Sequence, residues 1–209
     1  CSSDLLPRLY SVSSPRDGER SNYNNLALTV KRDEQGVCSN YLCDLKQGDE
    51  VQITGPFGAT FLMPDDPDAR LLMICTGTGS APMRAFTMRR QRTSGSRKNA
   101  MVMFFGARRK NSLPYFGPLS KLPIDLMEQH LVFSREGEKE YVQDRMRSEA
   151  DKVAELLKDN RTHIYVCGKK DMESGVTSAL NDIAKAQGLE WSTLQSQMRE
   201  EGRFHVETY

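Results

Sequence analysis

The stretch CTGTGSAP, residues 75–82, combines residue types that can hold a phosphate group. Gly77 and Gly79 allow the backbone to approach an anion closely. Pro82 lies where a helix is expected to begin, a position at which a proline needs no amide hydrogen. Amide N–H groups at a helix N-terminus favour phosphate oxygens. The pattern predicts a phosphate-binding turn, and a tight strand-to-helix turn without a ligand is the alternative.

This glycine turn alone does not identify a nucleotide. It departs from the dinucleotide fingerprint G-x-G-x-x-G, because Pro82 occupies the position of the third glycine. The acidic residue that binds the ribose of NAD is expected about 20 residues further on. That residue is missing from the segment RTSGSRKNA at 92–100. Other parts of the chain must therefore decide which nucleotide is bound.

The elements around the turn alternate along the second part of the chain. Apolar runs typical of buried parallel strands occur at 71–75, 100–106, 130–134 and 163–168, with RFHVETY at the end. Helical spacing is found between them, at 81–93, 144–158, 171–187 and 191–201, and more weakly around 112–122. This alternation predicts a doubly wound α/β domain with a parallel sheet. Ligands bind beyond the carboxyl ends of such strands, so functional residues are expected just after each run.

Residues 1–63 follow a different pattern. Short β-rich runs (RLYSV, NLALTVKR, VQITG and TFLM) are separated by clusters of Gly, Pro, Asn and Asp, which predicts antiparallel β structure in a barrel or meander. CSNYLCDL predicts a short helix between two of these strands. The composition of MPDDPDAR at 63–70 indicates a linker. We therefore expect a first domain at 1–65 and a second at 66–209.

Composition excludes several classes of protein. The 209 residues carry a formal net charge of +1, and no apolar run is long enough to span a membrane, so neither a nucleic acid nor a membrane is expected as a partner. The 5 cysteines lack C-x-x-C spacing, which argues against a disulfide framework and a metal site and favours a reducing, cytoplasmic setting. The chain begins with Cys1 and enters RLYSV almost at once, so we expect further residues upstream.

Several motifs together carry a family resemblance. They are RLYS (8–11), GVCSN (36–40), FSRE followed by KEYVQ (133–136 and 139–143), YVCG (165–168), CTGTGSAP and the final VETY. Their order and spacing resemble the plant-type ferredoxin–NADP reductase family over essentially the whole chain. The resemblance implies the C-terminal part of an antiparallel FAD-binding β-barrel, followed by a doubly wound parallel-sheet NADP-binding domain.

The resemblance assigns FAD to the first domain. It implies that Arg8 binds the pyrophosphate, that Tyr10 stacks on the isoalloxazine ring and that Ser11 lies at the flavin N5. A guanidinium fork suits phosphate and an aromatic face suits a flat ring, although an ordinary strand has the same residue types. Ser39 is implied as a second pyrophosphate contact and is equally suited to a plain N-cap. The implied FAD residues are Arg8, Leu9, Tyr10, Ser11, Lys31, Gly36, Val37, Cys38, Ser39 and Tyr209.

The resemblance assigns NADP(H) to the second domain. Thr78 and its glycines are implied to hold the pyrophosphate, while Ser134, Arg135 and Lys139 surround the 2′-phosphate. A phosphate dianion needs donors and positive charge, whereas NAD calls for an acidic residue. A solvated charged loop, REGEKE, is the alternative. The implied NADP residues are Gly77, Thr78, Gly79, Pro82, Arg108, Ser134, Arg135, Lys139, Tyr141, Gln143, Cys167, Gly168 and Met172.

The implied hydride-transfer site combines Ser11, Cys167, Glu207 and Tyr209. The resemblance places Tyr209 on the open face of the flavin, from which nicotinamide displaces it. The alternatives are a Cys167 that is inert packing and a terminal aromatic residue that is frayed. The implied activity is an FAD-dependent NADPH oxidoreductase that passes single electrons to a ferredoxin-type iron–sulfur protein or an upstream iron–sulfur domain. No metal is expected within this chain.

Within the family, one subgroup shares further stretches. SPRDGER, NYNNLALTVKR and GRFHVETY are similar to the reductase components of benzoyl-CoA 2,3-epoxidases, which implies a role in aerobic benzoate catabolism and a di-iron oxygenase as partner. A general ferredoxin–NADP reductase and a diflavin reductase module are alternatives. From another class, a flavin-free NADP-binding interaction module keeps the fold without the chemistry.

Overall fold

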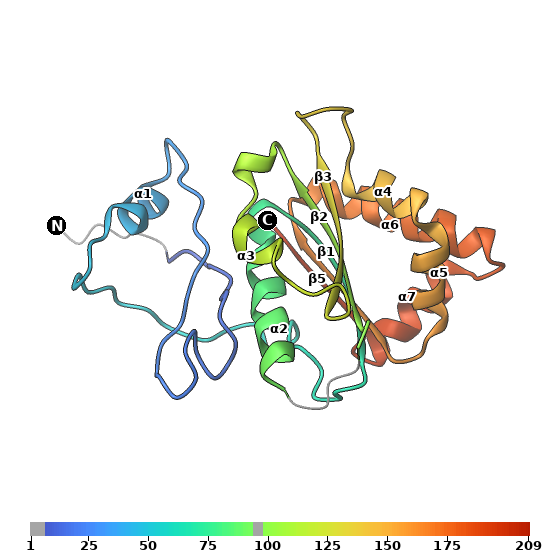
Figure 1. The fold of residues 1–209 in the computed structure, drawn as a ribbon, viewed down its shortest axis with the longest axis horizontal. Helices are drawn as coiled ribbons and strands as arrows, with labels where there is room; N and C mark the ends of the chain where they lie inside the picture. The colour runs from blue at the N-terminus through green and yellow to red at the C-terminus, as the bar shows by residue number, and fades with distance from the viewer. Residues whose placement is uncertain (1–6, 94–97) are drawn as a thin grey trace.

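The computed structural model describes residues 7–93 and 98–209, so Cys1 and part of the RTSGSRKNA segment lie outside it. Its centre is a 5-stranded parallel sheet with the strand order β3-β2-β1-β4-β5 (Figure 1). The strands are β1 (Arg70–Thr76), β2 (Met101–Ala107), β3 (Met127–Phe133), β4 (Thr162–Gly168) and β5 (Phe204–Thr208). Every strand expected in the second part of the chain is therefore confirmed.

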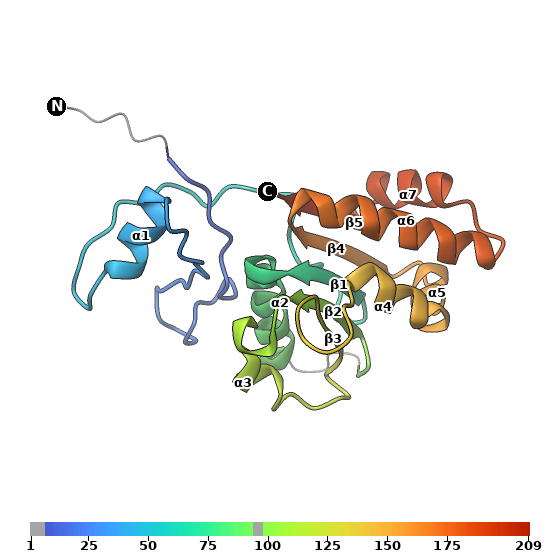
Figure 2. The ribbon, with the colours of Figure 1, turned by 90° about the horizontal axis from the view of Figure 1, so that it is seen from above.

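Helices cover both faces of this sheet (Figure 2). One face carries α2 (Ser80–Arg92) and α3 (Phe116–Leu119). The other carries α4 (Val142–Ser148), α5 (Ala150–Lys158), α6 (Lys170–Ala186) and α7 (Trp191–Glu200). This is the doubly wound arrangement expected from the alternating pattern.

Two helix predictions are corrected. The single helix expected at 144–158 is two helices, because Glu149 leaves the helical region with φ −102° and ψ 31°. The helix expected around 112–122 is reduced to a 3-10 turn at Lys110–Ser112 and the 4-residue α3. Pro114, Pro118 and Pro123 interrupt this stretch, and proline removes the amide donors that a longer helix needs.

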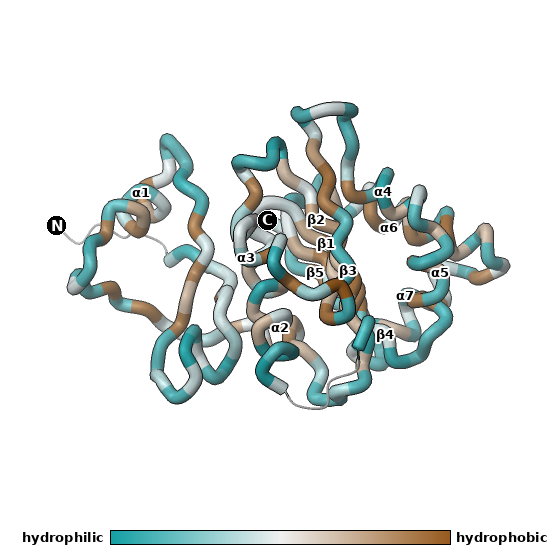
Figure 3. Tube along the Cα trace, in the orientation of Figure 1, coloured by the Kyte–Doolittle hydropathy of each residue, from teal (hydrophilic) through white to brown (hydrophobic). Residues whose placement is uncertain are grey.

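The apolar runs are continuous because both faces of the central strands are buried. Leu72 and Phe104 belong to the cluster beneath α5 and α6, whereas Met73 and Phe105 belong to the cluster beneath α2. Successive side chains of a strand point to opposite faces, so each strand contributes to both clusters. Figure 3 shows hydrophobic residues concentrated along these strands.

The 7–66 region contains less regular structure than expected. It holds α1 (Val37–Asp44), which confirms the short helix, and one isolated antiparallel bridge between Val12 and Leu28. The runs VQITG and TFLM form no ladder with any described residue. A strand is stable only beside hydrogen-bonded neighbours. The antiparallel strands expected here are therefore not formed, apart from that bridge.

The expected linker is tightly packed against the sheet domain. Arg90 of α2 donates hydrogen bonds to the carbonyl oxygens of Asp66, Pro67 and Ala69. Phe61 and Met63 are buried in the cluster beneath α2. The end of the first domain is thus part of the core of the second.

The described residues, 7–93 and 98–209, contain neither a membrane-spanning helix nor a metal-ligand cluster. No described helix is long and apolar enough to cross a membrane. No group of 3 or more described His, Cys, Asp or Glu side chains is arranged to hold a metal ion. The described cysteines, Cys38, Cys43, Cys75 and Cys167, are all free thiols.

Candidate functional site

The glycine turn after β1 is a 3-10 turn, η1 (Gly77–Gly79), that leads directly into α2. A Cβ atom at Gly79 would lie 2.1 Å from the carbonyl oxygen of Cys167, so only glycine fits there. The helix begins at Ser80, which makes Pro82 its third residue and not its first as expected. Proline is tolerated there because the first four amide groups of a helix have no internal acceptor. The turn brings β1 and β4 close together at the carboxyl edge of the sheet.

A buried hydroxyl next to this turn was not predicted. Thr76, the last residue of β1, has an Oγ1 atom that is buried without a hydrogen-bond partner among the described residues. A Cβ atom at Gly168, which has φ +154°, would lie 2.4 Å from that hydroxyl and 3.2 Å from Cε of Met172. A buried hydroxyl without a partner, next to backbone that only glycine can form, suits a ligand with hydrogen-bond acceptors. A polar residue closing the apolar run LLMIC was the signal in the sequence.

The C-terminal residue closes one side of the edge. The Tyr209 amide donates to the Gly168 carbonyl at 3.0 Å. Its phenol Oη lies 2.7 Å from Oγ1 of Thr78, so a hydrogen bond joins the chain end to the glycine turn. Thr208 Oγ1 donates to Oε2 of Glu173 on α6 at 2.7 Å, a contact that the sequence did not indicate. The chain end is therefore held in place and not frayed.

Cys167 and Glu207 are register partners on β4 and β5. Burial, and then the neighbouring Glu207 carboxylate, raise the pKa of the Cys167 thiol to about 12. Burial also raises the pKa of Glu207. A thiol in this state stays protonated at neutral pH and is no nucleophile. Cys167 is buried and Glu207 is partly buried, so the pair lies near the carboxyl ends of β4 and β5 with little exposure to solvent.

Ser11 is not in direct contact with these residues. No hydrogen bond among the described residues joins Ser11 to Cys167, Glu207 or Tyr209. The first region does approach Glu207 elsewhere, since a Cβ atom at Gly58 would lie 3.4 Å from its Oε1. The structure thus brings together three of the four residues implied for hydride transfer.

Positive charges gather at the other end of the edge, beyond β2 and β3. The Ser134 amide donates to the Ala107 carbonyl at 3.0 Å and the Arg135 amide donates to the Arg108 carbonyl at 2.9 Å, which places the two arginines side by side. Lys139 Nζ lies 5.1 Å from the centre of the Tyr141 ring. No described carboxylate forms an ion pair with Arg108, Arg135 or Lys139. These cations are available to an anion.

The acidic residue within this cluster has another partner. Oε2 of Glu136 accepts a hydrogen bond from the Lys110 amide at 2.6 Å, which fixes its carboxylate on the backbone. Gln143, by contrast, lies apart from the cations. A Cβ atom at Gly175 of α6 would lie 3.0 Å from its side chain, so Gln143 packs against that helix.

The residues implied for FAD lie in two adjacent segments. Burial, and then the nearby Cys38 in the first turn of α1, raise the pKa of Tyr10. Leu9 is 84% exposed, and Lys31 is exposed without an ion pair to a described carboxylate. Tyr10 of RLYS and Cys38 of GVCSN therefore lie near each other, although the two motifs are distant in the sequence.

The role of Ser39 as an N-cap is wrong. The N-cap of α1 is Gly36, with extended φ and ψ and no side-chain cap. Ser39 Oγ instead donates to the Gly36 carbonyl at 3.2 Å and accepts from the Asp33 amide at 3.1 Å. The hydroxyl thereby closes the turn before the helix. The backbone amides of the first turn of α1 are left without a side-chain acceptor, as an anion site requires.

Comparison with known families agrees with both parts of this description. The chain matches an oxidoreductase FAD-binding domain over residues 1–61 and an oxidoreductase NAD-binding domain over residues 73–178. It is 40% identical over 223 residues to the cyanelle ferredoxin–NADP reductase of Cyanophora paradoxa, covering 97% of this chain and 61% of that protein. It is 37% identical over 223 residues to the ferredoxin–NADP reductase of Spirulina sp., covering 97% and 76%.

The chain belongs to the ferredoxin–NADP reductase family. It is also 37% identical over 222 residues to the ferredoxin–NADP reductase of Synechocystis sp., covering 97% of this chain and 54% of that protein. The chain thus spans 61% and 54% of the length of the Cyanophora and Synechocystis relatives. The cofactors of these matched domains are FAD and NADP(H), as expected.

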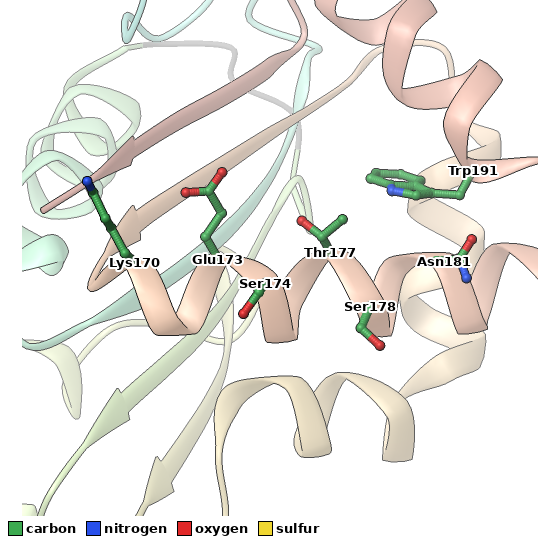
Figure 4. A pocket seen from close by; sticks show the side chains of 7 residues that line it. All are labelled: Lys170, Glu173, Ser174, Thr177, Ser178, Asn181 and Trp191. Carbon is green, nitrogen blue, oxygen red and sulfur yellow. The ribbon is translucent and has the colours of Figure 1, made fainter.

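One groove of this reductase-family chain lies outside the predicted site. It has a volume of about 720 Å³ and runs along α6 toward Trp191 of α7 (Figure 4). Its lining residues are Lys170, Glu173, Ser174, Thr177, Ser178, Asn181 and Trp191. None of them is among the residues implied for FAD or NADP. The residues predicted to bind the cofactors lie instead at the carboxyl edge of the sheet and in the 7–66 region.

Proposed function

We propose that this chain is the FAD- and NADP(H)-binding part of a ferredoxin–NADP reductase that exchanges electrons between NADP(H) and a ferredoxin-type iron–sulfur protein. One observation carries the proposal. Three groups lie along a single edge of the sheet. Beyond β2 and β3 are cations that form no ion pair with a described carboxylate, and after β1 comes the glycine turn. Beyond β4 and β5 lie the Cys167–Glu207 pair and Tyr209. This is the order in which an extended NADP molecule presents its 2′-phosphate, its pyrophosphate and its nicotinamide.

The residues at the two ends would do different work. Arg108, Arg135 and Lys139 supply charge-assisted donors for a 2′-phosphate, and Tyr141 supplies a flat face for adenine. Thr76, Thr78 and the glycines face the pyrophosphate. At the other end the neutral Cys167 thiol packs against the nicotinamide without reacting, because its pKa is raised. Each residue here binds or orients the nucleotide.

The first region would hold the flavin. Arg8, Tyr10 and the uncapped amides of α1 offer an anion site and an aromatic face near each other. When bound, the flavin supplies the chemistry, since it accepts a hydride and releases electrons singly. Tyr209 lies between the glycine turn and Gly168, so it must move before a nicotinamide ring can reach that position. Burial raises the pKa of Glu207, which favours its protonated form more than in an exposed carboxyl group.

The reductase component of a benzoyl-CoA 2,3-epoxidase is the narrower candidate. Its support is the likeness of SPRDGER, NYNNLALTVKR and GRFHVETY, and it would add a di-iron oxygenase as partner. The curated relatives named above are ferredoxin–NADP reductases, and they support the general function better. A ferredoxin is therefore the partner that we propose.

The test uses the intact protein that carries this chain. A yellow protein that reduces ferricyanide and ferredoxin with NADPH, and that is slow with NADH, supports the proposal. A colourless protein that binds NADPH would instead indicate the flavin-free interaction module. Reduction of a di-iron oxygenase with no reduction of ferredoxin would favour the narrower candidate.

A further inference from the structure

Helix α2 begins at the glycine turn and carries arginines that reach back to the 7–66 region. Arg84 and Arg92 lie about 12 Å apart along this helix, given a rise of about 1.5 Å per residue. Both contact residues 13–19, which we call the 13–19 loop. This loop begins two residues after Ser11. One helix therefore contacts both the predicted nucleotide turn and the loop that follows the predicted flavin segment.

Arg84 makes the closer set of contacts. Its Nη1 donates to the Ser13 carbonyl at 2.8 Å and to Oε2 of Glu19 at 2.8 Å, while Nη2 donates to Oε1 of Glu19 at 2.5 Å. The guanidinium also lies 5.0 Å from the centre of the Tyr115 ring. Its side chain is only 24% exposed. The hydrogen bonds from Arg84 lower the pKa of Glu19, so this carboxylate stays charged at neutral pH.

Arg92 holds the other side of the loop. Its Nη1 donates to Oδ2 of Asp17 at 2.9 Å and to the Gly18 carbonyl at 2.7 Å. Its Nη2 donates to the Glu19 carbonyl at 2.6 Å. The two arginines thus bind three backbone carbonyls and two carboxylates of one short loop.

The loop is in turn fixed to the segment around Ala27. The Ser13 amide donates to the Ala27 carbonyl at 2.8 Å, and the Ala27 amide donates to Ser14 Oγ at 3.0 Å. Ser13 and Ser14 are buried. Ser11 lies at most about 7 Å along the chain from Ser13, since an extended residue spans about 3.5 Å. A shift of the Ser13 carbonyl therefore shifts Ser11.

We propose that Arg84 is a positioning residue, which holds the 13–19 loop so that Ser11 and Tyr10 stay in register with the glycine turn and Tyr209. The proposal rests on the proposed function for the meaning of that register. Arg84 touches neither nucleotide residues nor flavin residues directly. It acts on hydride transfer through the loop, and it leaves the binding of the 2′-phosphate to the far end of the sheet.

An arginine is required by this geometry. Its planar fork binds both Glu19 oxygens and still reaches the Ser13 carbonyl, whereas a lysine ammonium is a point charge on a flexible stem. Arg84→Lys keeps the charge and loses the fork. The exchange of both charges, Arg84→Glu with Glu19→Arg, keeps a fork and reverses its direction. These variants separate charge, geometry and mere presence of a side chain.

The experiment compares Arg84→Ala, Arg84→Lys and the charge exchange in the intact flavoprotein. Arg89→Ala is the matched control, because Arg89 lies on the same helix and pairs with an Asp65 side chain that is 95% exposed. We measure flavin reduction by NADPH in a single turnover, the dissociation constant of NADP⁺ and hydrogen exchange at the amides of Ser13 and Ala27. Hydrogen exchange reports on the loop without any reaction.

We expect Arg84→Ala to slow flavin reduction about 10- to 100-fold, because a displacement of about 1 Å costs that much. The dissociation constant of NADP⁺ should change less than about 2-fold, since a distant site makes no shared contact. The Ser13 amide should exchange faster. Arg84→Lys should recover part of the rate, because an ammonium still donates to the Ser13 carbonyl. The charge exchange should recover less, because it restores the ion pair but a carboxylate at position 84 cannot donate to that carbonyl.

Three results would overturn the proposal. One is a rate of flavin reduction in Arg84→Ala that equals that of Arg89→Ala. Another is faster amide exchange with an unchanged rate, which would make the contact purely structural. The third is a weakening of NADP⁺ binding as large as the loss of rate. A wild-type protein without FAD or NADPH oxidation would instead refute the proposed function, and the exchange data would still test whether Arg84 holds the loop.

Discussion

The 7–66 region and the sheet domain meet different physical conditions within one chain. In the sheet domain every strand has a hydrogen-bonded neighbour, and the side chains of β1 and β2 are almost fully buried. The described 7–66 region has one isolated bridge instead of a ladder, and its Leu9, Tyr23, Ile53 and Phe57 are exposed. Polar contacts hold most of this region, and only its end, at Phe61 and Met63, reaches the core of the sheet domain.

This difference has a physical origin. In an α/β fold each helix returns the chain to the next parallel strand, so neighbours along the sequence complete the sheet. Antiparallel barrel strands depend on partners that can be distant in the chain. In the described 7–66 region, Arg84 and Arg92 of α2 hold residues 13–19, and Phe61 and Met63 pack into the core beneath α2. Directional hydrogen bonds thus position the first part of this region, and packing positions its end.

The largest contrast should come from two phenylalanines. Phe104 is 0% exposed in β2, whereas Phe57 is 71% exposed. Phe104→Ala should lower the free energy of unfolding by about 4 kcal/mol, because it leaves a cavity in the core. Phe57→Ala should change it by less than about 0.5 kcal/mol. Urea denaturation followed by circular dichroism measures both. Equal losses would show that the exposed Phe57 ring contributes as much to stability as the buried Phe104 ring.

Nucleotide choice should depend on the sheet domain alone. Arg135→Ala should raise the KM for NADPH about 10- to 100-fold, since a charge-assisted hydrogen bond contributes about 1.5–3 kcal/mol. The KM for NADH should stay the same, because NADH has no 2′-phosphate. Lys46→Ala, an exposed cation of the first region outside the predicted sites, is the control and should leave both constants unchanged. Steady-state kinetics with the two nucleotides gives the answer, and equal effects of Arg135→Ala on both would remove the 2′-phosphate assignment.

A stack of aromatic rings near the junction of the two regions predicts a dependence on pH. His163 stacks on Tyr165 and His205, and Nδ1 of His205 lies 2.6 Å from the Thr60 carbonyl oxygen. Burial, and then His205 and Arg203, lower the pKa of His163 from 6.5 to about 4. Arg90 opposes protonation too, and Asp66 favours it. Burial lowers the pKa of His205 as well.

The sign follows from these shifts. The native state holds His163 neutral, so its contribution to stability is fully present above pH 6.5 and is lost as the pH falls through about 4. His163→Phe keeps a ring in the stack and removes the titration. Thermal unfolding of this variant should depend less on pH between 6.5 and 4 than that of the wild type. Parallel curves would show that other groups cause the loss.

The smallest effect concerns the chain end, where the flavin region and the sheet domain are expected to meet. Tyr209→Phe removes the hydrogen bond to Thr78 and keeps the ring, whereas Tyr209→Ser removes the ring. Loss of one exposed hydrogen bond, about 0.5–1 kcal/mol, should tighten NADP⁺ binding about 2- to 5-fold in Tyr209→Phe. Tyr209→Ser should tighten it further and relax the preference for NADPH. Identical dissociation constants for the two variants would show that the ring covers no nicotinamide position.

The local sequence pattern was sufficient to predict most of the strands and helices of the second domain. Buried runs such as LLMIC and YVCG predict parallel strands, and the residues just after them are those that the sheet gathers at one edge. The break at Glu149 was missed, because a single residue that leaves helical geometry does not disturb the apolar spacing. The N-cap alternative for Ser39 was wrong, because a serine near a helix start has several hydrogen-bond partners within reach.

The sequence by itself determined the fold class, the glycine turn and the family, because these depend on residue types at fixed spacing. Only the tertiary structure decided which side chains meet. It placed the Tyr209 phenol beside Thr78, 131 residues away in the sequence, and Arg84 beside Glu19, 65 residues away. It also left the Thr76 hydroxyl without a hydrogen-bond partner among the described residues. Such contacts arise from how strands and helices pack in three dimensions, and no local pattern records them.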